Sequence, residues 1–191
     1  MHRDVLRAAS ELLDERGYSR LTMEAVAHRA KVGKATVYRW WSSKSALALE
    51  VLAERYQSHP VPDSGDSRQD LVAFLSVNIV EQLRQVDRAT ALALSADVAD
   101  DPEARRIWVD LGVTRRRLGR AVVGRVIARG DLPEDTDVDL VLDMFAGFTF
   151  FRRNLTDRPI GVQYAEQLVD LLLGGQVPRR TAQRATGPPE D

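Results

Sequence analysis

The chain has 191 residues, of which 44% are hydrophobic and 29% are charged, so it can bury a core beneath a charged surface. It contains no cysteine, which excludes disulfides, zinc–thiolate sites and thiol nucleophiles. A net charge of −1 is unlike that of a protein that coats DNA without regard to sequence. No apolar run is long enough for a membrane helix and the N-terminal MHRDVLRAASELL is too charged for a signal peptide, so we expect a cytoplasmic protein.

The first element that the sequence predicts is a helix near the N-terminus. Its apolar residues recur at helical spacing, and Gly17 follows them as a natural end of the helix. These residues are Val5, Ala8, Ala9, Leu12 and Leu13. We expect this helix to pack against the next two and to complete a three-helix unit.

Residues 22–44 differ in charge from the chain as a whole. Neither Asp nor Glu occurs between residues 25 and 49, whereas basic and large aromatic residues are frequent there. They are Arg29, Lys31, Lys34, Arg39 and Lys44, with Tyr38, Trp40 and Trp41. A local positive field with aromatic side chains attracts a phosphate backbone, so nucleic acid is the first partner to consider.

The apolar spacing predicts two short helices within this stretch. Thr22 can cap the first helix, and the second is predicted over about residues 34–41 with Ala35 or Val37 facing inward. The short turn between them contains Gly33, and small residues permit a steep, tight crossing, as in a helix-turn-helix. The apolar face of the first helix consists of Met23, Val26, Ala27 and Ala30.

These residues resemble the N-terminal domain of the TetR/AcrR family of bacterial transcriptional regulators. The resemblance spans Leu21 to Leu52: the run KATVYRWW, residues 34–41, followed by Ser43-Lys44, falls on the family's recognition helix and the start of its next helix. Lys31 stands where the family usually has Gly, and Gly33 stands where it often has Ser. A Lys with positive φ costs on the order of 1 kcal/mol, so the first departure bears on the geometry of the turn.

The resemblance implies that the second short helix reads DNA. Thr36 suits a thymine methyl or a base edge, and Lys34 or Arg39 suits guanine or phosphate. Tyr38 suits phosphate, as does Lys44 at the N-terminus of the following helix. The predicted DNA-binding residues are Thr22, Lys34, Ala35, Thr36, Tyr38, Arg39, Trp40 and Lys44. The alternative is that this basic helix is only a solvated face over the edge of a core.

The remainder of the chain also shows helical patterns, and no strand pattern competes with them. The Pro- and Gly-containing segment SHPVPDSGDS, residues 58–67, is a loop and a plausible domain boundary. Helices are predicted over about residues 71–83, 89–98, 101–129, 138–153 and 159–172. We therefore expect an all-α protein with three parts: a helix-turn-helix domain at 1–57, including a connecting helix at about 43–57, a helical effector-binding and dimerisation domain at 66–173, and a disordered tail at 174–191.

The last two predicted helices carry more apolar residues than one packing face needs. Such a surplus commonly indicates a partner, so we predict a homodimer formed through about residues 136–153 and 159–173. A two-fold dimer would present two recognition helices to a palindromic DNA site. The alternative is that both apolar stripes belong to the core.

Large apolar side chains in neighbouring helices predict a ligand pocket in the second domain. The resemblance implies that a small effector binds there and alters the spacing of the DNA-reading helices. The predicted lining residues are Phe74, Leu92, Trp108, Leu111, Met144, Phe145 and Phe148. For each of them, a place in the ordinary core is the alternative.

The other residue groups favour structural roles, and we expect no cofactor and no metal. His2, His28 and His59 are too scattered for a metal site. Asp101-Pro102-Glu103 is better explained as a helix start than as part of an acidic cluster. The basic run at 115–117 points in three directions on one helix, which favours salt bridges over a second DNA contact.

Three functions are consistent with the sequence. The leading one is a DNA-binding transcriptional regulator, a repressor released from a palindromic operator by a small apolar or amphipathic effector, and not an enzyme. The second is a helical enzyme, which would require convergent polar groups in the pocket. The third is a helical interaction module whose basic face binds an acidic protein, and such a module would show no preference for DNA sequence.

Overall fold

The computed structural model describes residues 1–55, 58–81, 86–156 and 158–175, and the regular elements in these residues are all helices. The all-α fold predicted from the sequence is therefore confirmed. None of the helices in these ranges has the length and the apolar character needed to cross a membrane. The predicted tail from residue 176 onward lies outside the described residues, as do residues 56 and 57 at the predicted end of the connecting helix.

The N-terminal domain is built as predicted around the first helix. Its elements are α1 (His2–Arg16), the 3-10 turn η1 (Tyr18–Arg20), α2 (Met23–Arg29), α3 (Lys34–Trp40) and α4 (Lys44–Arg55). The five apolar residues predicted to face inward from α1 are all buried. Gly17 ends α1 with φ 71°, a conformation that glycine adopts without steric cost.

The turn between α2 and α3 closes with a Schellman arrangement in which Lys31 occupies the left-handed position. The Lys31 N–H donates to the His28 carbonyl at 3.2 Å, and the Val32 N–H donates to the Ala27 carbonyl at 3.0 Å. Lys31 has φ 55°, so the residue that departs from the family pattern does adopt positive φ. Of the two alternatives for the inward-facing residue of α3, Val37 is the one that is buried, and Ala35 is exposed.

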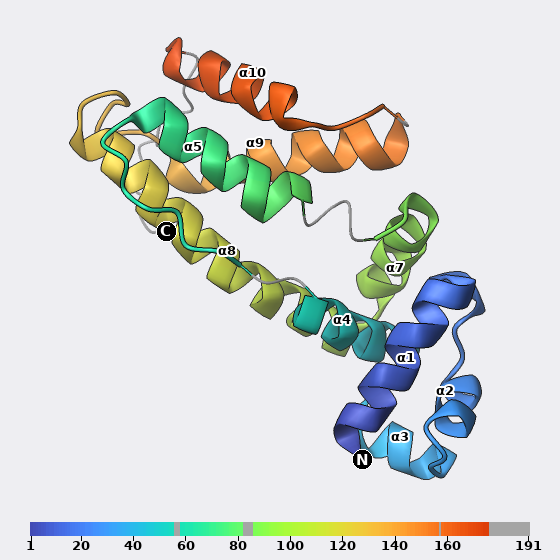
Figure 1. Ribbon diagram of the computed structural model, residues 1–191. Helices are drawn as coiled ribbons and strands as arrows, with labels where there is room; N and C mark the ends of the chain where they lie inside the picture. Colours follow the sequence, from blue (N-terminus) through green and yellow to red (C-terminus); the bar gives the residue numbers. More distant parts are fainter. Residues whose placement is uncertain (56–57, 82–85, 157, 176–191) are drawn as a thin grey trace, which may run out of the picture.

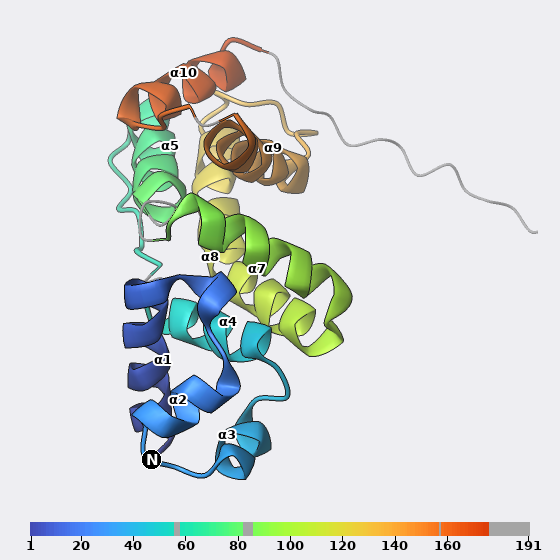
Figure 2. The ribbon, with the colours of Figure 1, turned by 90° about the vertical axis from the view of Figure 1, so that its right-hand side faces the viewer.

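The remaining helices form the C-terminal body. They are α5 (Ser67–Leu75), the π segment η2 (Ser76–Val80), α7 (Arg88–Asp100), α8 (Pro102–Ala128), α9 (Val138–Phe150), the π segment η3 (Phe151–Leu155) and α10 (Val162–Leu173). Figure 1 shows α1–α4 at one end of the molecule and α5, α9 and α10 at the other, with α8 running between the two ends. Figure 2 shows α7 lying along α8.

Two predicted elements differ from the structure in their details. The helix expected over 71–83 widens into a π segment after Leu75, which turns Asn78 inward and leaves Val77 exposed. Asn78 accepts from the His59 N–H at 2.8 Å and donates to the His59 carbonyl at 3.0 Å, so its buried amide is satisfied. The last helix begins at Val162 after Gly161, and Pro159, predicted to open it, lies in an irregular segment before it. Residue 83 lies outside the described residues.

The described residues form two hydrophobic cores, and α8 contributes to both. The first core joins α1–α4 to Leu94 and Val98 of α7 and to Ala104 at the start of α8. The second core joins α5, α9 and α10 to Val122, Val123 and Val126 near the end of α8. The N-terminal unit is thus packed against α7 and α8, and α8 extends continuously from the first core into the second.

Candidate functional site

Helix α3 presents the predicted DNA-binding residues at one end of the molecule. In both views it lies far from α9 and α10 (Figures 1 and 2). Lys34, Ala35, Tyr38 and Arg39 are exposed. Thr36 and Trp40 are half-buried, whereas Val37 and Trp41 are buried and fix the helix to the core.

Several charged residues at this end already have partners within the chain, so they are only partly available to bind an anion. Lys34 forms an ion pair with Glu24, whose carboxylate raises the pKa of Lys34, and it lies 5.5 Å from the ring centre of Tyr38. The Arg39 guanidinium lies 5.3 Å from the ring centre of Trp40. Arg29 is tied to Glu11 and Glu15 of α1 and serves the packing of α2 on α1. The positive face therefore centres on α3 rather than on the whole acid-free stretch.

Thr22 and Lys44 lie at the edges of this surface. The Thr22 hydroxyl accepts from the Ala25 N–H at 3.2 Å, which confirms it as the N-cap of α2. The Lys44 ammonium lies 3.7 Å from the Asp97 carboxylate and 4.4 Å from the ring centre of Tyr18. The hydroxyl of Tyr18 donates to Asp97 at 2.5 Å, and burial together with Asp97 raises the pKa of Tyr18. Lys44 is thus held by α7, with about a third of its side chain exposed.

Asp101 joins the start of α4 to the start of α8. It accepts from the hydroxyls of Ser43 at 2.5 Å and Ser45 at 2.7 Å. The same carboxylate caps α8 by accepting from the backbone of Glu103 and Ala104, and these bonds, that of Ser43 foremost, lower its pKa. The capping interpretation of Asp101 is confirmed. Asp101 therefore bonds the first turn of α8 directly to the start of α4, the helix that follows α3.

A cavity of about 180 Å³ lies in the C-terminal body between α5, η2, α8 and α9. Its described lining residues are Phe74, Ile79, Trp108, Gly112, Arg115, Arg116, Leu142 and Ala146. Two residues predicted from the sequence, Phe74 and Trp108, are among them. Gly112, Arg115 and Arg116 were missed, although they follow Trp108 on the same helix face at spacings of four, seven and eight.

The structure places the other five predicted pocket residues elsewhere. Phe145 is buried in the core of the C-terminal body, and Leu111 packs against the N-terminal core. Leu92 is half-buried on α7. Met144 and Phe148 are 47% and 37% exposed on the outside of α9, so large apolar side chains alone did not distinguish a pocket from a surface.

Met144 and Phe148 belong to an exposed apolar stripe. Along α9 and η3, exposed apolar residues recur at spacings of four, four, three and four, which keeps them on one side of the helix. They are Leu140, Met144, Phe148, Phe151 and Leu155, and we call them the α9 stripe. Val162 and Leu171 of α10 are exposed as well.

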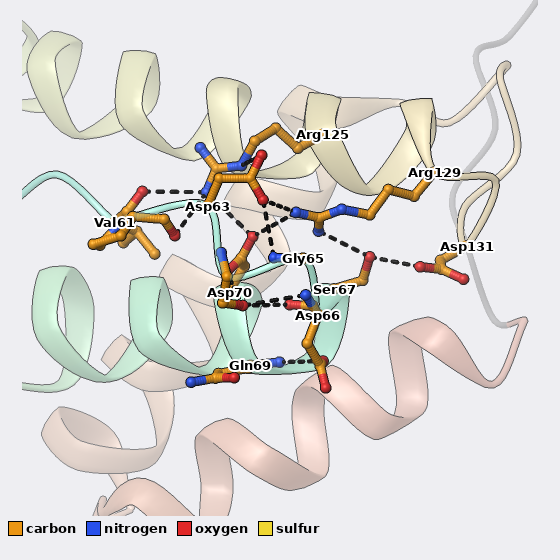
Figure 3. Close-up of polar contacts among 12 residues, drawn as sticks. Val61, Asp63, Gly65, Asp66, Ser67, Gln69, Asp70, Arg125, Arg129 and Asp131 are labelled. Atoms are coloured by element: carbon orange, nitrogen blue, oxygen red, sulfur yellow. Dashed lines mark hydrogen bonds and ion pairs between the residues drawn. The ribbon is translucent and has the colours of Figure 1, made fainter.

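A polar cluster fastens the loop before α5 to the far end of α8 (Figure 3). Asp70, which is 1% exposed, accepts from Arg125 at 3.3 Å, from Arg129 at 3.1 Å and from the Ser64 hydroxyl at 2.7 Å. Burial raises the pKa of Asp70, but these hydrogen bonds outweigh burial and hold it at about 2. Arg116, one of the three consecutive arginines, pairs with Asp139 and Asp143 of α9, as a salt-bridging role predicts.

Comparison with known proteins accounts for both ends of the molecule. Residues 5–51 match the profile described as "Bacterial regulatory proteins, tetR family", and residues 61–172 match "Tetracyclin repressor-like, C-terminal domain". The chain belongs to the TetR family. The resemblance stated from the α3 residues is therefore confirmed, and it extends over both domains.

Individual relatives are similar over most of their length. The uncharacterized HTH-type transcriptional regulator YdeS of Bacillus subtilis is 32% identical over 170 residues, which is 88% of this chain and 85% of YdeS. The DNA-binding transcriptional repressor TetR of Mycobacteroides abscessus is 29% identical over 178 residues, 88% of this chain and 90% of the repressor. The crystal structure of the TetR family regulator SCO0332 is 30% identical, with a TM-score of 0.67 over 93% of this chain and 98% of that one.

Proposed function

We propose that this protein is a transcriptional repressor that binds a palindromic operator as a homodimer and leaves it when a small effector enters the cavity. The observation that carries the proposal is the placement of α3. Its buried side anchors it through Val37, while Lys34, Tyr38 and Arg39 face solvent at the end of the molecule opposite α9 and α10. We assign no enzymatic activity to it, and because its proposed partner is chromosomal DNA, we place it in the cytoplasm.

The proposed contacts follow the exposure of the side chains on α3. Lys34, Thr36 and Arg39 would meet base edges or phosphates in the major groove, where short polar and basic side chains discriminate bases. Tyr38 and Lys44 would bind phosphates on either side, and Thr22, Ala35 and Trp40 would complete the contact surface. Lys44 must exchange Asp97 for a phosphate when DNA binds, and Lys34 must likewise exchange Glu24.

The α9 stripe supports the proposed dimer. Four of its five exposed apolar residues lie in the predicted interface at 136–153, with Leu155 just beyond it, and Val162 and Leu171 lie in the part at 159–173. A two-fold axis through these helices would place one α3 on each side of the pair. Two recognition helices related by a two-fold axis bind half-sites about one helical turn of DNA apart, or a multiple of it.

The long helix α8 supports the proposed response to an effector. Trp108 and Gly112 of α8 line the cavity, and Asp101 at its start is bonded to Ser43 and Ser45 of α4. A ligand that favours another position of α8 would therefore also change the position of α3 relative to its dimer mate. By linkage, an effector that weakens DNA binding must itself bind the DNA complex less tightly.

DNA binding is tested first with the DNA that flanks the protein's own coding region, by fluorescence anisotropy with excess random competitor at several salt concentrations. We expect saturable binding to a palindrome. If the flanking DNA contains no operator, a selection of bound genomic fragments will identify one. Tyr38→Ala and Lys44→Ala should each weaken this binding about tenfold, since a hydrogen bond to a charged group contributes about 1.5–3 kcal/mol. Arg117→Ala, which removes an exposed charge from the middle of α8, is the matched control. Unchanged operator affinity in both α3-region variants contradicts the assignment of α3.

A further inference from the structure

We propose that the cavity binds a small organic anion with a single ring, such as an aromatic carboxylate. Its ring would lie among Phe74, Leu142 and Trp108, and its anionic group would lie at Arg115 and Arg116. This inference rests on the proposed function, because it names the chemical class of the effector. Three properties of the cavity carry it: its volume, the shape of its α8 wall and the charge of its lining.

The volume limits the ligand to about one ring. A cavity of about 150 Å³ is sufficient for benzene in a protein core. The cavity here is about 180 Å³, which leaves room for a ring and one small substituent. A fused ring system held wholly inside would have to displace the side chains of α5 or α9, and a longer chain would have to extend past Trp108 into solvent. Phe74, Ile79 and Leu142 make that displacement costly because each is at most 5% exposed and packed in the core.

On the α8 side of the cavity, Gly112 contributes no side chain. A Cβ atom placed on Gly112 would meet no other atom within 4 Å, so the space above this residue belongs to the cavity. Glycine in a helix interior lowers helix stability by up to about 1 kcal/mol relative to alanine, so the space at Gly112 is kept at a cost to the stability of α8. Trp108, one helical turn earlier, is 45% exposed and so lies where the cavity opens to solvent, with its indole available to cover a bound ring.

The charged residues among the described lining residues are both arginines. The Arg116 guanidinium donates to Asp139 at 3.1 Å and to Asp143, and Arg120 shares Asp139 at 2.7 Å. A guanidinium has five N–H donors, and these two aspartates engage one each, so the fork retains donors for a third anion. A ligand cation would find no carboxylate among the described lining residues. A neutral ring would fill the space but would gain no charge-assisted hydrogen bond.

The test uses three probes of equal size and different charge: benzoate, benzamide and benzylammonium. Binding to the full-length protein is measured by isothermal titration calorimetry and by saturation-transfer NMR. We expect benzoate to bind, benzamide to bind at least tenfold more weakly, and benzylammonium not to bind. Arg115→Gln and Arg116→Gln should each reduce benzoate affinity about tenfold and leave benzamide affinity unchanged.

The chain offers a matched pair of variants for locating the site. Gly112→Leu should fill the cavity and abolish benzoate binding. Gly124→Leu makes the same exchange on the same helix at an exposed position where a Cβ also meets nothing within 4 Å, and it should leave benzoate binding unchanged. Both variants should gain helix stability, which melting curves followed by circular dichroism will show.

Each contrary result overturns the inference. Equal affinities for benzoate and benzamide would remove the role of the arginines. Benzoate binding that survives Gly112→Leu would place the ligand elsewhere, and no binding of benzoate at about 10 mM would exclude the class. These results leave the proposed function standing if the wild-type protein still binds its operator, whereas loss of operator binding with intact benzoate binding would contradict only the proposed function.

Discussion

The two ends of this molecule differ in how completely they bury their apolar side chains. At the N-terminal end, Trp41, Val37 and Tyr18 are each buried to within 1% of their surface, and the polar atoms of Tyr18 and Trp41 have carboxylate partners. The C-terminal body leaves a cavity beside Phe74 and an exposed apolar stripe along α9.

The N-terminal end is thus a closed unit that carries α3, whereas the C-terminal body retains apolar surface that the folded chain does not cover. A helix that reads DNA must hold its side chains in a fixed geometry, which the closed N-terminal core provides. A ligand site and a subunit interface require the opposite, namely apolar surface that the folded chain has not already covered. The helix α8 takes part in both cores and so physically connects the two ends.

The largest effect should come from breaking the polar cluster that holds the C-terminal body together. Asp70→Asn removes a buried carboxylate that binds Arg125 and Arg129, and losing one partner of a buried pair costs about 3–5 kcal/mol. Denaturant unfolding followed by circular dichroism will measure this cost. Asp63→Asn, at an exposed carboxylate that contacts the same arginines, is the control and should cost less than about 1 kcal/mol. Equal losses in the two variants would contradict the role assigned to the burial of Asp70.

The same carboxylate gives the stability of the body a defined pH dependence. The folded-state pKa of Asp70, about 2, lies below the ordinary value of 3.8. Its bonds therefore stabilise the fold fully above about pH 4, and that stabilisation is lost as the pH falls from about 4 towards 2. In Asp70→Asn, this part of the acid dependence should be absent.

The next largest effect should come from placing a charge on the α9 stripe. Phe148→Glu would bury a carboxylate in the proposed interface and should raise the dissociation constant of the dimer at least a hundredfold, as sedimentation velocity will show. Operator affinity should fall with it, because a monomer reaches only one half-site. Val113→Glu is the control, since Val113 is equally apolar and is 54% exposed on α8, outside the proposed interface. A wild-type protein that is monomeric at micromolar concentration would contradict the assignment of the α9 stripe to a dimer interface.

Sequence patterns predicted the N-terminal end more completely than the C-terminal body. The inward residues of α1, the cap at Thr22 and the outward side of α3 follow from local spacing, which the fold does not override. The π segment at Ser76–Val80 has no such local signal, since the contact it accompanies, between Asn78 and the backbone of His59, joins residues 19 positions apart.

The cavity was the least predictable feature. Phe74 and Trp108 were identified by size, but size also selected Met144 and Phe148, which the fold leaves on the surface. The difference depends on how α8 and α9 are rotated about their axes, which sequence spacing does not give. Gly119 contributes to their close packing, because a Cβ there would lie 2.6 Å from the Leu142 side chain and 2.8 Å from the Phe74 side chain, and these side chains would have to shift.

A smaller effect tests the contact between α4 and α7 at Lys44. Asp97→Asn keeps an acceptor for the Tyr18 hydroxyl but removes the charge that holds the Lys44 ammonium. Freed from this competition, Lys44 should bind phosphate more readily, and operator affinity should rise about threefold to tenfold, a change of up to about 1.4 kcal/mol. Asp100→Asn makes the same change in net charge on the exposed end of α7 and should raise the affinity much less. If both variants raise affinity equally, the effect is one of overall charge and the ion pair with Lys44 plays no part.

The smallest effect concerns the turn that sets α3 against α2. Lys31 adopts φ 55° at a position where a side chain costs about 1–2 kcal/mol, and glycine would relieve this cost while adding freedom to the unfolded chain. Lys31→Gly should therefore stabilise the protein by up to about 1 kcal/mol, measured as a higher denaturation midpoint at unchanged slope. Lys31→Ala, which removes the charge but retains the Cβ atom, should give no such gain. If alanine stabilises as much as glycine, the relevant property of Lys31 is its charge, and the strain assigned to this turn is absent. Stabilisation by glycine but not by alanine would show that the well-packed N-terminal unit keeps a strained residue in the turn that positions α3.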